Sequence, residues 1–250
     1  MVYSIYGVKV GQSPNWFFSG IQPVYRSDVG RDQPVPYPIW VIKGENRVVL
    51  VDTAFDTEVT APWPKTATTF GTEQSLAEAG VDTSKVTDVI ITHMHVDHFT
   101  GYTKFPQAKF YIQKKELDHC LGSVNTFPKV FGFPLRAAQD TIALMRHGRL
   151  RVVDGDEELF PGLKVVLAGG HTPGLQMLAV ETEKGTAFLA SDNAYLYHNL
   201  KEDLPVGYYC NLVEAARAIR IAKKIASSED MIIPGHDYTL WGEKKVVKVF

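Results

Sequence analysis

The stretch VIITHMHVDH, residues 89–98, decides how this chain is interpreted. Its apolar start is followed directly by three histidines and one aspartate within six positions: His93, His95, Asp97 and His98. A strand that ends at Ile91 would leave these four side chains on one tight loop at its carboxyl end. Imidazole and carboxylate groups are the ligands that zinc, iron and similar divalent ions take. The stretch therefore predicts a metal-binding loop.

Three further candidate ligands lie downstream, each after a short apolar run and beside glycine, proline or serine. His171 lies in GGHTPG, residues 169–174, and His236 lies in IIPGHD, residues 232–237. Asp192 follows the run AFLAS, residues 187–191. Short apolar runs bounded by such residues are typical of buried strands. We therefore expect these three side chains also to lie at strand ends.

This order of residues, HxHxDH followed by a histidine, an aspartate and a histidine, resembles the metallo-β-lactamase fold superfamily over about residues 39–240. The resemblance implies an α/β fold, a four-layer αββα sandwich, in a single domain over residues 1–250. It also implies seven metal ligands: His93, His95 and His171 for one ion, Asp97, His98 and His236 for a second, and Asp192 bridging the two.

The chemistry of such a pair of ions agrees with this grouping. Two cations about 3.5–4 Å apart repel each other, and a shared carboxylate and a shared hydroxide screen that repulsion. His93 and His95 are two positions apart, so on an extended loop they can point the same way, whereas the neighbours Asp97 and His98 diverge. We expect two divalent ions, zinc first, with iron, cobalt and manganese as alternatives. A hydroxide held between them would be the nucleophile.

Within the superfamily the chain is most similar to the N-acyl-homoserine lactone hydrolases. The segment SDNAY, residues 191–195, places Tyr195 three residues after Asp192, which is characteristic of that branch. The resemblance implies that the Tyr195 phenol donates a hydrogen bond to the lactone carbonyl as negative charge develops on it. It also implies that Asp97, besides contacting metal, serves as general acid to the departing alkoxide. The predicted function is opening of an N-acyl-homoserine lactone or a related small lactone.

Alternative functions of the same fold stay open at this point. A thioester hydrolase like the hydroxyacylglutathione hydrolases shares all seven ligands, although those enzymes usually carry a longer, basic C-terminal region. A mononuclear iron sulfur dioxygenase retains the HxHxDH motif, and a non-catalytic metal-dependent binder is a further class. The diiron oxygen reductases carry glutamate at the position of His95, and many β-lactamases carry cysteine at the position of Asp192. Both of those branches are therefore disfavoured.

The composition limits location and partners. The formal charge of the 250 residues is −2 and no long block of like charge occurs, which argues against nucleic acid as a partner. We see no secretory signal and no apolar run of about 20 residues, so we expect a cytoplasmic protein without membrane contact. Cys120 and Cys210 are too few for a disulfide framework. The expected partner is a small-molecule substrate, with a homodimer as a further expectation.

Several local patterns predict structure around the site. Residues 39–43 and 48–52 suit a hairpin, residues 21–38 with four prolines suit an extended loop, and residues 211–227 suit a helix. Asn211 would cap that helix, with Glu214 as its capping-box partner. Asp52 is expected to orient a ligand histidine, in a segment where the family often has Asp-Thr-Gly and this chain has Ala54.

Aromatic residues in expected loops are candidates for lining the substrate pocket. They are Trp16, Phe17, Phe18, Phe127, Phe131, Phe133, Tyr195, Tyr197, Tyr208 and Tyr209.

Overall fold

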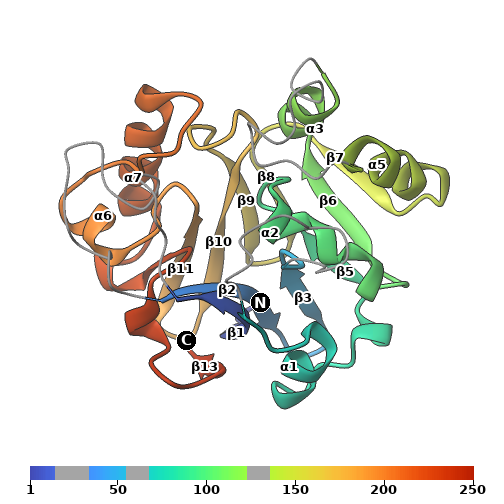
Figure 1. Cartoon of the computed structure of the whole chain (residues 1–250). Coiled ribbons are helices and arrows are strands. Elements are labelled where there is room, and N and C mark those ends of the chain that lie inside the picture. Colours follow the sequence, from blue (N-terminus) through green and yellow to red (C-terminus); the bar gives the residue numbers. More distant parts are fainter. Residues whose placement is uncertain (15–33, 55–67, 123–135) are drawn as a thin grey trace.

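The computed structural model describes residues 1–14, 34–54, 68–122 and 136–250. Their strands form two sheets (Figure 1). The first sheet has the order β13 (Val246–Lys248), β1 (Ser4–Ser13), β2 (Val35–Lys43), β3 (Val48–Val51), β5 (Asp88–Ile90), β6 (Lys109–Gln113) and β7 (Leu150–Val153), with β4 (Thr68–Thr69) paired to β1. The second has the order β12 (Ile232–Pro234), β11 (Gly185–Ser191), β10 (Gln176–Thr182), β9 (Leu163–Leu167) and β8 (Glu157–Phe160).

Helices cover the outer faces of the two sheets (Figure 1). The α-helices are α1 (Thr72–Glu78), α2 (Val96–Phe99), α3 (Lys114–Leu121), α5 (Ala137–Arg146), α6 (Tyr197–Lys201) and α7 (Leu212–Ile225). Short 3₁₀ turns are η1 (Thr83–Lys85), η2 (Thr100–Lys104), η4 (Glu229–Met231) and η5 (Tyr238–Leu240).

Among the described residues, buried apolar side chains form three large cores, as a four-layer arrangement requires, and one small cluster of Val35, Tyr37, Tyr195, Leu196 and Val206. One core lies between the first sheet and helices α1, α3 and α5, which contribute Leu76, Leu117 and Leu144. A second lies between the sheets, with Val51 from β3 and Leu178 from β10 among its members. A third joins the other face of the second sheet to the apolar face of α7. The interior strands therefore bury both faces, and the predicted four-layer αββα sandwich is confirmed.

The parallel parts of the sheets bring the loops with the predicted metal ligands to one edge. Strands β3, β5, β6 and β7 run parallel to one another in the first sheet, and β11 and β12 run parallel in the second. The HxHxDH loop follows β5, Asp192 follows β11 and His236 follows β12. The carboxyl ends of parallel strands meet at one edge, where ligands of open α/β sheets commonly bind.

The hairpin prediction is confirmed, because β2 pairs antiparallel with β3 from Trp40 opposite Val51 to Lys43 opposite Val48. Of the extended loop predicted over residues 21–38, residues 21–33 lie outside the described residues. The prediction is wrong for residues 35–38, which belong to β2. Pro36 lies in the part of β2 that pairs with β1 but not with β3. A proline lacks an N–H, so it fits a strand wherever one side needs no donor.

Helix α7 is capped as expected, although its capping box is not formed as predicted. The Asn211 side chain accepts hydrogen bonds from the backbone N–H groups of Val213 and Glu214. The Glu214 carboxylate instead accepts from the backbone N–H of Gly170, at 3.3 Å, in the loop that carries His171. This contact connects the start of α7 to the metal site.

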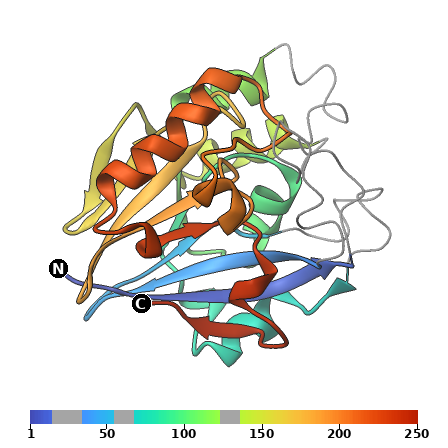
Figure 2. The ribbon, with the colours of Figure 1, turned by 90° about the vertical axis from the view of Figure 1, so that its left-hand side faces the viewer.

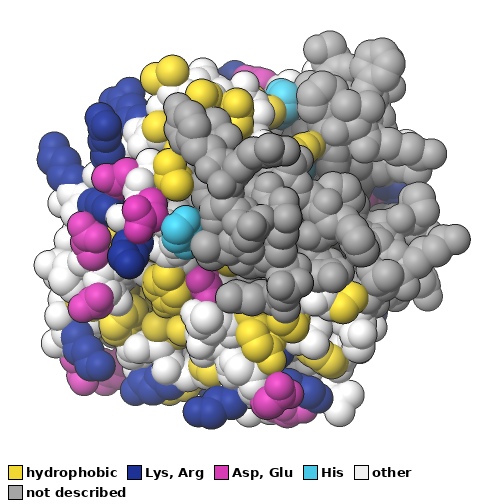
Figure 3. Space-filling model, turned by 60° about the vertical axis from the view of Figure 1, so that its left-hand side comes forward, with side chains coloured by type: hydrophobic (Ala, Val, Ile, Leu, Met, Phe, Trp, Pro, Cys, Tyr) yellow, Lys and Arg dark blue, Asp and Glu magenta, His cyan; other side chains and the backbone are white. Residues whose placement is uncertain are grey.

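Both termini lie on the same side of the molecule (Figure 2). On the face in Figure 3, basic and acidic side chains are interspersed rather than gathered by sign. Within the described ranges, no helix has the length and apolar character needed to cross a membrane. The single domain over residues 1–250 and the cytoplasmic location stay predictions.

Candidate metal centre

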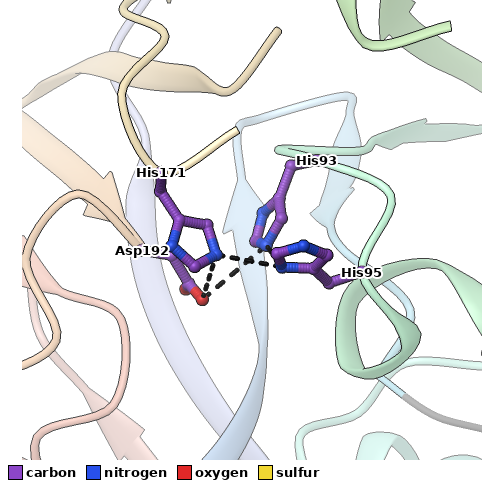
Figure 4. A group of neighbouring side chains, drawn as sticks. All are labelled: His93, His95, His171 and Asp192. Carbon is purple, nitrogen blue, oxygen red and sulfur yellow. Dashed lines mark hydrogen bonds and ion pairs between the residues drawn. The ribbon is translucent and has the colours of Figure 1, made fainter. Parts of the chain in front are cut away.

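The seven predicted ligands come together as two adjacent groups. In each group the ligand atoms all lie within 4.8 Å of one another, and every member is buried. The first group, whose rings and carboxylate converge in Figure 4, consists of His93, His95, His171 and Asp192. The second consists of Asp97, His98 and His236. Both groups have a composition that could hold a divalent ion.

A change in backbone conformation separates the ligands of the HxHxDH segment. His95 is extended, with φ −64° and ψ 160°, and the single turn of helix α2 begins at Val96. Asp97 and His98 therefore lie on a helical turn, whereas the whole motif was expected to form one tight loop. The turn directs these two side chains to the second group, while His93 and His95 remain with the first.

Four histidines direct Nε2 into the centre and fix Nδ1 with an outer partner. Nδ1 of His171 donates to the carbonyl of Tyr208 at 2.7 Å, and Nδ1 of His236 donates to the carbonyl of Pro36 at 2.8 Å. The other two Nδ1 contacts are His98 to the Asp52 carboxylate at 2.8 Å and His93 to the Thr92 hydroxyl at 3.1 Å. Such outer partners set the tautomer and orientation of metal-binding imidazoles.

His95 is turned the other way, with Nδ1 facing the centre. That atom lies 3.0 Å from Nε2 of His93 and 2.9 Å from Nε2 of His171. In the described part of the chain, Nε2 of His98 is buried and makes no hydrogen bond. Buried polar atoms are normally satisfied, so an inward-facing atom of this kind fits a metal ligand.

Asp192 presents one oxygen to each group. Its Oδ2 lies 3.4 Å from Nε2 of His171 and 3.7 Å from Nε2 of His93. Its Oδ1 lies 3.1 Å from Nε2 of His236 and 3.4 Å from Nε2 of His98. The carboxylate thus lies between the two groups.

Burial and neighbouring charges set the protonation of the ligands. Burial lowers the pKa of His95 to about 3 and lowers those of His93 and His171, which favours neutral imidazoles. Burial also disfavours charge on His98, but the carboxylates of Asp192, Asp97 and Asp52 outweigh it and raise the pKa of His98 well above its usual value. Burial opposes ionisation of Asp192 too, yet the surrounding histidines hold its pKa well below the ordinary range.

Asp52 links the metal site to the strand beneath it. Its carboxylate accepts the backbone N–H of Thr92 at 2.7 Å as well as Nδ1–H of His98. The Thr92 hydroxyl donates to the same carboxylate and accepts from the hydroxyl of Ser191 at 3.0 Å. The expected contact of Asp52 with a ligand histidine is present. Asp52 and Ala54 both have left-handed backbone, with φ 65° and 55°.

Tyr195 packs against both groups of ligands. Its ring meets those of His171 and His236 edge-on, with centroids 5.8 and 5.5 Å away. Its hydroxyl oxygen lies 3.5 Å from Nδ1 of His171. Burial, reinforced by Asp192 and Asp97, raises the pKa of the Tyr195 phenol well above its usual value. The phenol therefore keeps its proton and can act as a donor.

Glu116 is a buried participant that the sequence did not reveal. Its carboxylate accepts hydrogen bonds from the N–H of Met94, the hydroxyl of Thr172 and the N–H of Gly174. Burial raises its pKa to about 7, partly offset by those hydrogen bonds. No local pattern identifies it, because its donors are far away in sequence. The backbone carbonyls of Pro36 and Tyr208 were missed for a similar reason, since any residue type could supply them.

The predicted aromatic pocket is only partly described. Tyr208 flanks the first group, with its ring centroid 5.4 Å from that of His171 and 5.7 Å from that of His95. Tyr195 is buried, while Tyr208 and Tyr209 are 38% and 39% exposed. The remaining candidates other than Tyr197 lie outside the described residues: Trp16, Phe17, Phe18, Phe127, Phe131 and Phe133.

The fold and the order of the predicted ligands agree with a match to a protein-family model. The model of the metallo-beta-lactamase superfamily matches residues 32–236, so the chain belongs to that superfamily. N-acyl homoserine lactonase AiiA of Bacillus thuringiensis subsp. kurstaki is 23% identical over 176 residues, 70% of this chain. That match spans 64% of AiiA, just under two thirds of its length. N-acyl homoserine lactonase AttM of Rhizobium radiobacter is 24% identical over 239 residues, covering 88% of this chain and 89% of AttM.

Solved structures of lactonases share the fold. A B. thuringiensis AiiA variant with N-decanoyl-L-homoserine at its active site gives a TM-score of 0.74 at 21% identity, covering 96% of this chain and 95% of that one. AidC, a dizinc quorum-quenching lactonase with a product bound, gives a TM-score of 0.70 at 17% identity, covering 97% and 88%. At these identities the likeness establishes the architecture.

Proposed function

We propose that this protein is a dinuclear metal-dependent hydrolase that opens a lactone ring, with an N-acyl-homoserine lactone or a related small lactone as substrate. The observation that carries the proposal is the position of Asp192, with one oxygen toward each group of histidines. Relatives named as N-acyl homoserine lactonases support the choice of substrate class. Zinc is the proposed metal, because imidazole and carboxylate ligands in buried sites suit it.

The first ion would be held by His93, His95 and His171, and the second by Asp97, His98 and His236, with Asp192 shared. Two divalent ions bound there would supply a hydroxide at neutral pH and an electrophile for the lactone carbonyl. The outer partners of the histidines keep the ligand atoms in place, so that little rearrangement accompanies binding.

Two side chains have further roles in this proposal. Tyr195 stays protonated, and its hydroxyl donates a hydrogen bond to the carbonyl oxygen as negative charge develops there. Burial opposes charge on Asp97, but His98 outweighs it and lowers the Asp97 pKa, so the carboxylate is ionised. After the hydroxide has added to the carbonyl carbon, Asp97 accepts the proton of the newly added hydroxyl group and returns it to the alkoxide oxygen that leaves the opened ring.

The test is a hydrolysis panel with zinc-loaded protein. The panel contains N-hexanoyl-homoserine lactone, a simple γ-lactone, lactoylglutathione and a phosphotriester. Hydrolysis of each compound is monitored by the protons that it releases. We expect the homoserine lactone to give the highest kcat/KM, and Asp192→Ala to abolish it. No lactone opening by a metal-replete protein would contradict the proposal, and preference for lactoylglutathione would indicate a thioester hydrolase. A homodimer also stays a prediction, for which light scattering is the measurement.

A further inference from the structure

Glu116 is a fully buried carboxylate surrounded by hydrogen-bond donors. It lies in the first turn of α3, directly after β6, and its side chain has no exposed surface. Oε1 accepts from the N–H of Met94 at 2.8 Å. Oε2 accepts from the hydroxyl of Thr172 at 2.8 Å and from the N–H of Gly174 at 3.1 Å. Hydrogen bonds to an ionised acceptor are about twice as strong as neutral ones.

These donors belong to two different metal-binding loops. Met94 lies between the ligands His93 and His95, and Thr172 directly follows the ligand His171. One oxygen of Glu116 thus holds the loop after β5, and the other holds the loop between β9 and β10. The only ligand of the first group outside these two loops is Asp192.

The backbone is packed as closely as the side-chain contacts. A Cβ placed on Gly174 would come within 2.0 Å of the backbone N of Glu116. The loop after His171 therefore rests directly on the start of α3.

We propose that Glu116 is a positioning residue that fixes the two loops relative to each other and thereby sets the metal affinity of the first group. This inference rests on the metal-binding part of the proposed function. In the part of the chain that the structure describes, no hydrogen bond joins Glu116 to a predicted ligand side chain; it acts through two backbone N–H groups and the Thr172 hydroxyl beside them. Asp52 holds His98 in the second group by a direct contact, so the two carboxylates serve different ions.

The test uses Glu116→Gln, which keeps the shape but turns one acceptor into a donor that faces other donors. The matched control is Asp118→Asn on the same helix, whose carboxylate is exposed and pairs with Lys114. Zinc affinities are measured by chelator competition, and the cobalt-loaded protein is examined by visible absorption. We expect Glu116→Gln to weaken one of the two binding steps 10–100-fold and to change the cobalt spectrum, with Asp118→Asn unchanged. A folded Glu116→Gln protein with both affinities and the spectrum unaltered would overturn the inference.

Thr172→Val covers the case in which Glu116→Gln does not fold, because it removes only one of the three donors. It should weaken the same binding step several-fold, and an unchanged affinity and cobalt spectrum would refute the inference. The outcomes separate this inference from the proposed function. Lactone hydrolysis by the wild type together with unaltered variants leaves the function standing and removes the role of Glu116. If the protein binds two metal ions and the variants behave as expected, but no lactone is hydrolysed, the role of Glu116 stands and the proposed lactonase function is contradicted.

Discussion

Asp52 accepts a hydrogen bond from Nδ1 of His98 at 2.8 Å and holds the Nε2 atom of that ring toward Asp192. Asp52 also accepts from the backbone and the hydroxyl of Thr92, the residue that precedes the metal ligands. The carboxylate therefore orients one predicted ligand directly and anchors the loop that carries His93, His95 and Asp97.

Removing the charge of Asp52 should lower the metal affinity of the second group, Asp97, His98 and His236. Asn is the suitable substitution, because φ at this position is 65° and Asn tolerates left-handed backbone better than Ala. In Asp52→Asn, the amide must place its NH₂ group against either the imidazole or the backbone N–H. We expect a 10–100-fold loss of affinity in one zinc-binding step, measured by chelator competition. Asp230→Asn, at an exposed position, is the control, and equal affinities in the two variants would contradict the assignment.

Tyr195→Phe tests the proposed hydrogen bond to the carbonyl oxygen. Loss of one such donor typically lowers kcat about 100-fold or more, and we expect that loss with metal content unchanged. Tyr102→Phe is the matched control, because its hydroxyl is also buried but donates to Asp140 in another core. A kcat for Tyr195→Phe close to that of the control would show that Tyr195 only packs against the ligands.

The stability of the metal-free protein should depend on pH through Glu116. Burial raises the pKa of Glu116 to about 7 from a usual 4.5, so the folded protein disfavours its charged form. The resulting stability is fully present below pH 4.5 and is lost as the pH rises through 7. The shift corresponds to about 3 kcal/mol as an upper figure.

Urea unfolding of metal-free protein between pH 4.5 and 8 measures this dependence. Glu116→Gln cannot ionise at this position, so its unfolding free energy should fall less over the same interval than that of the wild type. The histidine ligands titrate in both proteins and cancel in the comparison. Parallel curves for the two proteins would contradict the assignment.

Ala54→Gly tests the backbone at the position where the family often has glycine. Ala54 is buried with φ 55°, and relief of left-handed strain would contribute about 1 kcal/mol. Loss of a buried methyl, about 0.8 kcal/mol, and greater freedom of the unfolded chain, about 0.4–1 kcal/mol, oppose that gain. We therefore expect an unfolding free energy within about 1 kcal/mol of wild type, and a loss of about 1.5 kcal/mol or more would mean that the strain is negligible.

The sequence predicted that the seven side chains would come together, because they have distinctive chemistry and follow strand ends. Their role as metal ligands stays a prediction. The sequence also predicted the contact between Asp52 and a ligand histidine. It did not predict the tertiary contacts between residues that lie far apart in the sequence. Pro36 is accommodated by pairing with Gln12 of β1. The carbonyl that Pro36 offers to His236 has a partner 200 residues away. Glu116 likewise has meaning only once two distant loops meet over α3.

Two short elements, β8 and α2, were also not predicted from the sequence. Strand β8, Glu157–Phe160, begins with two glutamates, and charged residues are common in edge strands. They interrupt the apolar pattern from which a strand is predicted. The single turn of α2 is too short to show helical periodicity. That turn nevertheless decides which ligands go to which group.

The central claim is that these ligands hold two ions joined by Asp192, and the most direct test is the metal content of the protein at saturating zinc. Elemental analysis after removal of unbound metal should give two zinc ions per chain for the wild type. Asp192→Ala should hold fewer, with His119→Ala as a histidine control outside both groups. A wild-type content of one ion or none would contradict the account.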